Sequence, residues 1–317
     1  MEPPWAMRPS FHRPKPDSQP FFDGEAGQLR SISPEASGGC AASFARVFEL
    51  CADRPCIGRR GGPQEPFFEW CSYGTFARDV NAAAAGLVRH LPAGGRVGIC
   101  AASSYEWIVM DFACLFAGMT SVALSDAWDS ATLQAVARSR GLSAIACDLA
   151  AASKCLEAAR SIEEPRALVL LQPVPPARPL RPAPDVLVLQ LAALLCEPPL
   201  QAPVARDPGA IHTIMHTSGT TGLPKGVEYS DALWLQNMSH FPADLCVAVS
   251  YQPLAFITDR HSVATTLWNG GRVGLVTYED HASKMESIVA DLQEIRPTVL
   301  KGVLASPNLS SCQLSFL

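Results

Sequence analysis

The sequence predicts an α/β fold in which strands alternate with helices along most of the chain. Short apolar runs of strand length recur between segments whose apolar residues have helical spacing. The pair Gly94-Gly95 separates one such helix from the strand that follows it. This strand–helix–strand order is typical of mostly parallel sheets covered by helices. The composition, 48% hydrophobic and 17% charged over 317 residues, agrees with a globular protein.

The predicted elements begin with a helix at Tyr73, whose apolar side chains share one face. The elements that follow it are strand 96–100, a helix from about Glu106, strand 121–124, helix 132–138 and strand 143–147. A proline-rich stretch at about 172–184 then separates two apolar runs. We expect it to be a surface insertion or a stiff linker.

The second half of the chain continues the alternation. The predicted elements are strand 211–216, a short strand 227–229, a helix capped by Ser230 or Asp231, strands 246–250 and 272–276, helix 284–295 and strand 299–303. Helix 284–295 has Ile288, Leu292 and Ile295 on one face, which we expect to point inward.

Two segments bear on membranes and export. The prolines of residues 1–38 predict a flexible N-terminus, and this segment lacks the apolar region of a secretory signal. The longest apolar run, 107–124, is interrupted by Asp111 and is shorter than a span of ~20 apolar residues. It therefore predicts a buried helix.

Charge and cysteine usage exclude several classes of function. The formal net charge is −5 and no dense run of lysine or arginine occurs, which argues against a nucleic-acid partner. Eleven cysteines cannot all pair, and no Cys-x-x-Cys pair with histidine partners marks a zinc site. These features favour a reducing, cytoplasmic setting. We expect Cys100, Cys114 and Cys147 to be core residues.

Residues 217–226 read Thr-Ser-Gly-Thr-Thr-Gly-Leu-Pro-Lys-Gly and are the strongest functional signal. Glycines permit positive φ and close approach of backbone N–H groups to an anion, and the hydroxyls can donate further hydrogen bonds. Lys225 adds a positive charge beside the rigid Pro224. The pattern predicts a polyphosphate site for ATP. Its candidate nucleotide-binding residues are Thr217, Ser218, Gly219, Thr220, Thr221, Gly222, Lys225 and Gly226.

Two alternatives to this interpretation are a Walker A loop and a surface turn. A Walker A loop has glycine before its lysine, serine or threonine after it, and a helix directly following. Here Pro224 precedes Lys225, Gly226 follows it, and strand-like residues come next. The other alternative is a surface turn rich in glycine, serine and threonine. The strand-like runs on both sides favour a loop that joins two strands.

This loop resembles the phosphate loop of the AMP-forming acyl-adenylate family, T-S-G-T-T-G-x-P-K-G, and every fixed position matches. Segments 55–59, 68–73, 251–260 and 291–298 are similar, in the same order, to segments of long-chain acyl-CoA synthetases. The resemblance extends from Pro55 to Val303. It implies the large-domain fold of that family, with αβ subdomains whose mostly parallel sheets are sandwiched by helices, in a truncated form.

The resemblance also implies a reaction. A fatty acid and ATP would give acyl-AMP and pyrophosphate, and coenzyme A would then displace AMP. Mg²⁺ would accompany ATP, with the Thr217 hydroxyl as a candidate near the metal; a plain loop hydrogen bond is an equal alternative for this hydroxyl. Phe256 lies where relatives carry a histidine in the acyl-site segment, and an aromatic wall suits an apolar substrate. Peripheral membrane association is a further implication.

The resemblance implies a division into 39–205, a first αβ subdomain, and 206–303, the part with the phosphate loop, followed by a divergent tail at 304–317. Family segments that hold the adenine, the ribose and the catalytic lysine are not found after residue 303. We therefore expect low activity for this chain alone. Two alternatives stay open: a non-catalytic paralogue that binds nucleotide or acyl ligand weakly, and a carboxylate reductase-like adenylation module.

Overall fold

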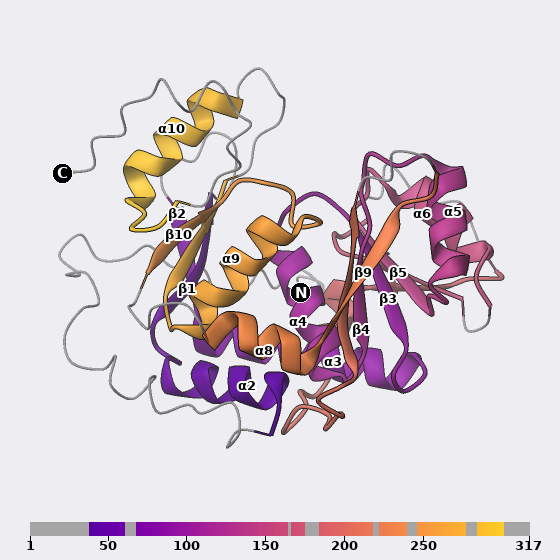
Figure 1. Cartoon of the computed structure of the whole chain (residues 1–317), viewed down its shortest axis with the longest axis horizontal. Helices are drawn as coiled ribbons and strands as arrows, with labels where there is room; N and C mark the ends of the chain where they lie inside the picture. Colours follow the sequence, from indigo (N-terminus) through magenta and orange to yellow (C-terminus); the bar gives the residue numbers. More distant parts are fainter. Residues whose placement is uncertain are drawn as a thin grey trace, which may run out of the picture.

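The computed structural model describes residues 38–60, 68–163, 166–174, 184–217, 222–239, 246–276 and 284–300. Within these ranges the strands form a seven-stranded and a four-stranded sheet, with helices between them and outside them (Figure 1). The α/β prediction is confirmed.

The large sheet has the order β7-β6-β5-β3-β4-β8-β9. All neighbouring strands are parallel except β8 and β9, which are antiparallel. Its register places Gly98 of the central strand opposite Val122 on one side and Ile145 on the other. The strands are β3 (Arg96–Cys100), β4 (Thr120–Ala123), β5 (Ala144–Cys147), β6 (Ala167–Leu170), β7 (Leu187–Gln190), β8 (Ile211–Thr217) and β9 (Lys225–Ser230).

The small sheet has the order β10-β11-β1-β2 and takes its strands from distant parts of the sequence. They are β1 (Pro55–Arg60), β2 (Phe68–Ser72), β10 (Val247–Ser250) and β11 (Arg272–Leu275). Strand β1 is antiparallel to β2 and parallel to β11. The predicted segments 39–205 and 206–303 are therefore interleaved, because each sheet contains strands from both.

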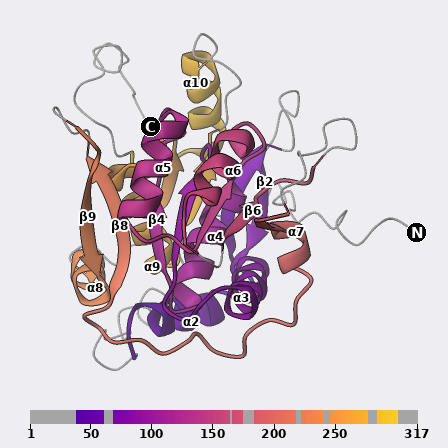
Figure 2. The same ribbon diagram turned by 90° about the vertical axis from the view of Figure 1, so that its right-hand side faces the viewer.

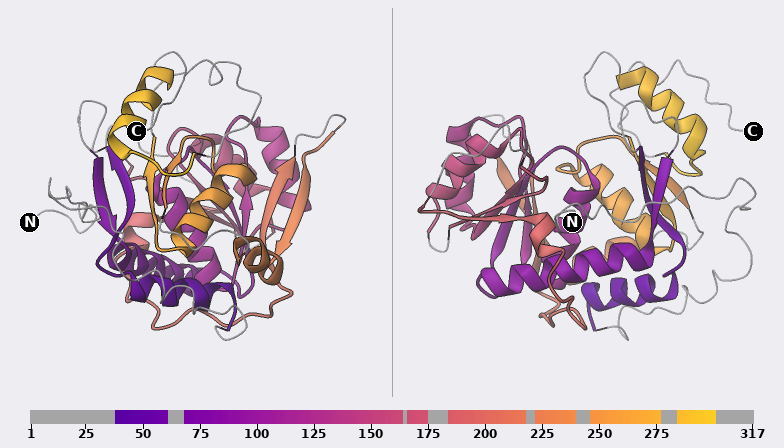
Figure 3. Two further views of the ribbon diagram at one scale, coloured as in Figure 1. Left: turned by 60° about the vertical axis from the view of Figure 1, so that its left-hand side comes forward. Right: turned by 180° about the vertical axis from the view of Figure 1, so that it is seen from behind.

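The helices form three layers around the two sheets. A central layer lies between the sheets and carries the largest hydrophobic core; its helices are α2 (Cys40–Leu50), α3 (Tyr73–His90), α4 (Tyr105–Phe116), α8 (Asp231–Ser239) and α9 (Ile257–Trp268). The outer layers are α5 (Ser130–Ser139) with α6 (Ala152–Arg160) on the large sheet, and α10 (Lys284–Ile295) on the small sheet. Figure 3 shows these outer layers on opposite sides of the molecule. The short α7 (Leu191–Leu194) follows β7.

Side-chain caps start helices α3, α4, α5 and α8. The side-chain oxygens of Ser72, Ser104, Asp129 and Ser230 each accept a hydrogen bond from the backbone N–H three residues later. Each cap satisfies one of the donors that a helix leaves unpaired at its first turn. The turns from β2 into α3 and from β3 into α4 are thereby fixed by local sequence.

Most of the predicted elements are confirmed, with ends shifted by a few residues. In α10 the three apolar residues predicted to point inward, Ile288, Leu292 and Ile295, are buried. The apolar run after Glu106 forms the buried helix α4, and Cys100, Cys114 and Cys147 are core residues. Among the described residues, no helix is both long and apolar enough to cross a bilayer.

The predicted strand 299–303 lies only partly within the described residues. At its start a single parallel bridge pairs Val299 with Ala248, supported by a hydrogen bond from the N–H of Thr298 to the carbonyl of Val247. Residues 301–303, and the predicted flexible N-terminus up to residue 37, lie outside the described residues, as does the tail 304–317. So does most of the proline-rich stretch.

Candidate active site

The phosphate-loop motif lies at the tip of the hairpin formed by β8 and β9. The hairpin ladder ends at the pair Thr217–Lys225, as predicted for a loop that joins two strands. Figure 2 shows this two-stranded ribbon at one edge of the large sheet. Because β8 is parallel to β4, its last residue lies at the carboxyl edge of the parallel strands, where open α/β sheets bind their ligands.

Four of the eight candidate nucleotide-binding residues are described: Thr217, Gly222, Lys225 and Gly226. Ser218, Gly219, Thr220 and Thr221 lie outside the described residues. Gly222 has a φ of 152°, a conformation that side chains with a Cβ rarely adopt. Gly226 is not in the positive-φ region, so its backbone does not require glycine.

The hairpin presents Thr217 and Lys225 on the same face, since directly opposed residues of an antiparallel pair point to the same side. Both are exposed. The Thr217 hydroxyl lies 3.4 Å from the Lys225 carbonyl and donates a hydrogen bond to it. An exposed threonine and an exposed lysine therefore share one face of the hairpin at the base of the phosphate loop.

His216 lies on the opposite face of this hairpin, packed against the sheet. Its Nδ1–H donates to the carbonyl of Ala123 at 2.8 Å, which links the end of β8 to the end of β4. Its ring makes an edge contact with Trp128 at 5.2 Å between centroids. Burial lowers the pKa of His216, the bond to Ala123 opposes this shift, and the charge of Arg140 adds to it. The imidazole is thus held neutral and acts as a tether.

Phe256 immediately precedes α9, and its side chain is 51% exposed. Its segment follows the carboxyl end of β10, so it lies at the same kind of strand end as the phosphate loop. The Ser103 hydroxyl joins the two sheets here: it donates to the carbonyl of Gln252 at 3.1 Å and accepts from the N–H of Leu254 at 2.9 Å. An exposed aromatic ring is available to an apolar ligand, but no contact in the structure tests this role.

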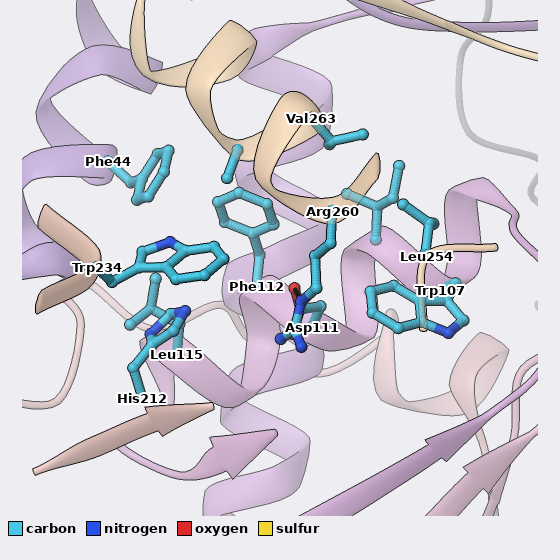
Figure 4. A pocket seen from close by; sticks show the side chains of 12 residues that line it. Phe44, Trp107, Asp111, Phe112, Leu115, His212, Trp234, Leu254, Arg260 and Val263 are labelled. Carbon is cyan, nitrogen blue, oxygen red and sulfur yellow. Dashed lines mark hydrogen bonds and ion pairs between the residues drawn. The ribbon is translucent and has the colours of Figure 1, made fainter. Parts of the chain in front are cut away.

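A small cavity lies in the central helix layer, between α4, α8 and α9 (Figure 4). Its walls are mainly aromatic and aliphatic, and it has room for about one water molecule. It is too small for an acyl chain. The side chains that line it include Phe44, Trp107, Asp111, Phe112, His212, Trp234, Leu254 and Arg260.

The polar centre of this cavity is an ion pair between α9 and α4. The guanidinium of Arg260 donates to both carboxylate oxygens of Asp111, with Nε at 2.9 Å from Oδ2. It also donates to the Thr213 hydroxyl at 2.6 Å and lies 5.2 Å from the ring centroid of Trp107. With every nitrogen engaged, Arg260 is a structural residue that joins α9, α4 and β8.

A second buried cluster borders the cavity. The Nδ1 of His212 lies 3.5 Å from Oδ1 of Asp231, and Arg206 Nε lies 3.7 Å from the same oxygen. The His212 ring stacks on Trp234 at 5.1 Å. Burial lowers the pKa of His212, while Asp231 acts in the opposite direction. The cluster joins the start of α8 to the beginning of β8, at the end of the hairpin that is away from the phosphate loop.

No group of three or more histidine, cysteine or acidic residues among the described residues could hold a metal ion. Thr217 remains the candidate hydroxyl for Mg²⁺. Mg²⁺ at nucleotide sites commonly takes one or two protein ligands, with the rest from phosphates and water, so a single hydroxyl is compatible with this chemistry.

The sequence alone does not identify Asp111 as the partner of Arg260. In the sequence Asp111 is an interruption of an apolar run, and Arg260 is part of a segment similar to one in the family that the chain resembles. A lone carboxylate within an otherwise apolar helix is a signal for a buried cation, because a buried charge needs a partner.

The chain is similar to known proteins in sequence and in fold. The sequence model of the family described as AMP-binding enzyme matches residues 47–306. Long chain acyl-CoA synthetase 6, peroxisomal, of Arabidopsis thaliana is 30% identical over 254 residues, which cover 74% of this chain and 34% of the relative. Long-chain-fatty-acid–CoA ligase 6 of Mus musculus is 26% identical over 274 residues, covering 81% and 38%.

The A domain of carboxylic acid reductase from Segniliparus rugosus, solved with AMP and a carboxylic acid, has a similar fold. The TM-score is 0.66 at 20% identity, covering 86% of this chain and 52% of that one. At this identity the likeness concerns the fold alone. The chain spans little more than a third of the two curated relatives.

Proposed function

Because this chain belongs to the AMP-binding enzyme family, we propose that it carries the phosphate-binding part of a long-chain fatty acid–CoA ligase. The substrates would be a fatty acid, ATP and coenzyme A, and the products acyl-CoA, AMP and pyrophosphate, with acyl-AMP as the intermediate. The long-chain acyl-CoA synthetases among the curated relatives support the choice of fatty acids.

The observation that carries the proposal is the paired position of Thr217 and Lys225 at the tip of the β8–β9 hairpin. Attack of a carboxylate on the α-phosphorus of ATP brings negatively charged groups together. Lys225 and the N–H and hydroxyl donors of the loop would neutralise this charge, which is the main protein contribution to phosphoryl-type transfer. Mg²⁺, when bound with ATP, would supply further charge neutralisation beside Thr217.

Phe256 would serve as part of an apolar wall for the acyl group. Its exposed ring cannot accept or donate a proton, so the proposal gives it a binding role and no catalytic one. Together with Lys225 it would place the fatty acid and ATP at the carboxyl edges of the two sheets.

A second candidate function is nucleotide binding without adenylation. It is favoured by the exposed pair Thr217 and Lys225 at the end of the hairpin ladder, because a hydroxyl and a lysine suit a phosphate group whether or not a carboxylate is activated. Such a chain would bind ATP through the loop and lack the groups that align the carboxylate.

The test is hydroxamate trapping of acyl-AMP from ATP, Mg²⁺ and a series of fatty acids, with ATP affinity measured in parallel. Lys225→Ala should weaken ATP binding at least tenfold, by about 1.4 kcal/mol or more. Arg138→Ala removes an exposed cation from the neighbouring helix α5 and is the matched control. It should leave ATP affinity unchanged.

Three results are distinguishable. Lys225-dependent hydroxamate formation supports the ligase, and Lys225-dependent ATP binding without hydroxamate supports the second candidate. A folded wild-type protein that binds no ATP contradicts both.

A further inference from the structure

Gly226 is glycine for a reason other than backbone conformation. It is part of β9, pairs with His216 of β8, and does not have a positive φ. A Cβ built on it would lie 2.7 Å from Cζ and 2.8 Å from Nη2 of Arg140, and 2.9 Å from Cγ2 of Ile214. All three distances are shorter than carbon can tolerate. The Arg140 guanidinium therefore occupies the place of the missing side chain.

Arg140 reaches this place from a fixed backbone. It is the C-cap of α5, with its N–H donating to the carbonyl of Val136 at 2.9 Å. Its own carbonyl accepts a hydrogen bond from the Arg96 side chain at 2.8 Å, which ties it to the start of β3. The guanidinium thus extends from a point anchored to the centre of the large sheet.

Arg140 contacts the hairpin by packing. Its Nε is buried and has no hydrogen-bond partner among the described residues. In the same region His216 is tethered to Ala123 and Trp128, as described above. The inner face of the hairpin end is consequently supported by one planar cation and one neutral ring.

The supported face is opposite to the one that presents the loop side chains. Gly226 and His216 form one opposed pair of the hairpin, and Lys225 and Thr217 form the next. Successive residues of a strand point to opposite sides of a sheet. Arg140 is therefore behind the hairpin, where it can set the position of Lys225 without touching a nucleotide.

We propose that Arg140 is a positioning residue for the phosphate loop: its guanidinium, packed over Gly226, fixes the arm of the hairpin that carries Lys225. This inference rests on the proposed function, since Lys225 is assigned there to the phosphates of ATP. Loss of the guanidinium leaves a space under β9, and a methyl group at Gly226 displaces the guanidinium. We expect both changes to shift the start of β9, where Lys225 lies.

The test is a double-mutant cycle on ATP affinity, measured by competition against a fluorescent ATP analogue with Mg²⁺. Arg140→Ala and Gly226→Ala should each weaken binding about tenfold, and the double variant by about tenfold rather than a hundredfold, because both remove one contact. Arg138→Ala, two residues away on the exposed side of α5, should bind as wild type. Arg140→Lys should not restore affinity, because lysine keeps the charge and lacks the planar group.

A second double-mutant cycle, between Arg140 and Lys225, tests whether Arg140 affects ATP affinity through the position of Lys225 or through the stability of the whole protein. In the Arg140→Ala background, Lys225→Ala should cost less than threefold, because the lysine is already misplaced. The proposal is wrong if the effects of the two single substitutions multiply in either cycle, or if Arg140→Lys binds ATP with wild-type affinity.

Amide hydrogen exchange, measured without nucleotide, tests the packing of Arg140 against β9 independently of ATP binding. Exchange in 225–230 should rise in Arg140→Ala and stay at the wild-type level in Arg138→Ala. If the wild-type protein binds no ATP, the proposed function fails, while this measurement still tests the contact. If ATP binding depends on Lys225 but neither affinity nor exchange responds to Arg140→Ala, the inference alone is wrong.

Discussion

Arg260 and Asp111 form a two-pronged ion pair in the interior that joins helix α9 to helix α4. The side chain of Arg260 is 3% exposed and that of Asp111 is 12% exposed. The pair connects the crossover helix of the small sheet to a helix that packs on the large sheet. The pair therefore links the helices that pack on the two sheets. It also stabilises the segment at Phe256, which lies one turn before Arg260.

Removing one partner of this pair should be strongly destabilising. Asp111→Ala leaves the guanidinium buried without its carboxylate, which costs about 3–5 kcal/mol in unfolding free energy. Urea denaturation followed by circular dichroism measures this loss. The exposed pair Arg46–Glu49 is the matched control, and Glu49→Ala should cost less than about 1 kcal/mol. Equal losses in both variants would show that burial does not determine the effect.

Gly271 should tolerate no larger residue, because another segment of backbone lies directly against it. A Cβ at this position would overlap the carbonyl oxygen of Cys246. The carbonyl of Gly271 also accepts the hydroxyl of Tyr73 at 2.6 Å, so the segment cannot move away freely. Gly271→Ala should cost about 3 kcal/mol.

The control for this substitution is Gly94→Ala. Gly94 has a φ of 70° but nothing within 4 Å of the added Cβ, so only backbone strain of about 1 kcal/mol opposes alanine. Denaturation midpoints of the two variants, compared at equal slope, test the difference. A Gly271→Ala protein as stable as Gly94→Ala would contradict the predicted overlap.

Sequence periodicity predicted several helices that have an apolar face, although α2 and α6, which also have one, were not predicted. Helix α10 is one of the predicted helices, with Ile288, Leu292 and Ile295 buried. Helix α9 was missed because it buries polar residues as well, among them Asp259 and Arg260. Its burial depends on partners from other elements, such as Asp111, which no local pattern reveals.

Some features of the candidate site could also be predicted from the sequence, and others could not. The phosphate loop was found from ten consecutive residues, and the hairpin that presents it follows from strand-like runs on both sides. The part played by Arg140 could not be found, because it depends on the register of β8 with β9 and on where α5 ends. Gly226 was explained from sequence by its backbone freedom, whereas the structure explains it by a neighbouring side chain.

The cysteines should differ sharply in reactivity. Cys196 is exposed, whereas Cys40 and Cys114 are buried, and burial raises the pKa of both of these thiols. Brief treatment with a maleimide should modify Cys196 completely and leave Cys40 and Cys114 unmodified until urea is added. Peptide mass spectrometry locates the label. Cys196→Ser should lose the rapid label at position 196, and rapid modification of Cys40 or Cys114 in the native protein would contradict their burial.

Protein stability should fall below about pH 6.5 because of His212. Its folded pKa lies below its ordinary value of about 6.5, so in this range the unfolded chain binds a proton that the folded chain does not. The stabilisation is fully present above the unfolded pKa and is lost as pH falls from there towards the folded pKa, by up to about 1.4 kcal/mol per pH unit. The groups that face the ring are Asp231, Arg206, Asp111 and Arg260.

His212→Gln should remove the contribution of His212 to the pH dependence of the unfolding free energy. His90→Gln, at the end of α3, should leave that contribution in place. His216 titrates in the same direction and stays in both variants. The pKa values of Asp79 and Asp291 are raised by burial, so these groups act with the opposite sign, above their ordinary value of 3.8. The informative quantity is therefore the difference between each variant and wild type in urea midpoints from pH 5 to pH 8. A His212→Gln protein with the wild-type slope would show that this imidazole is protonated equally in both states.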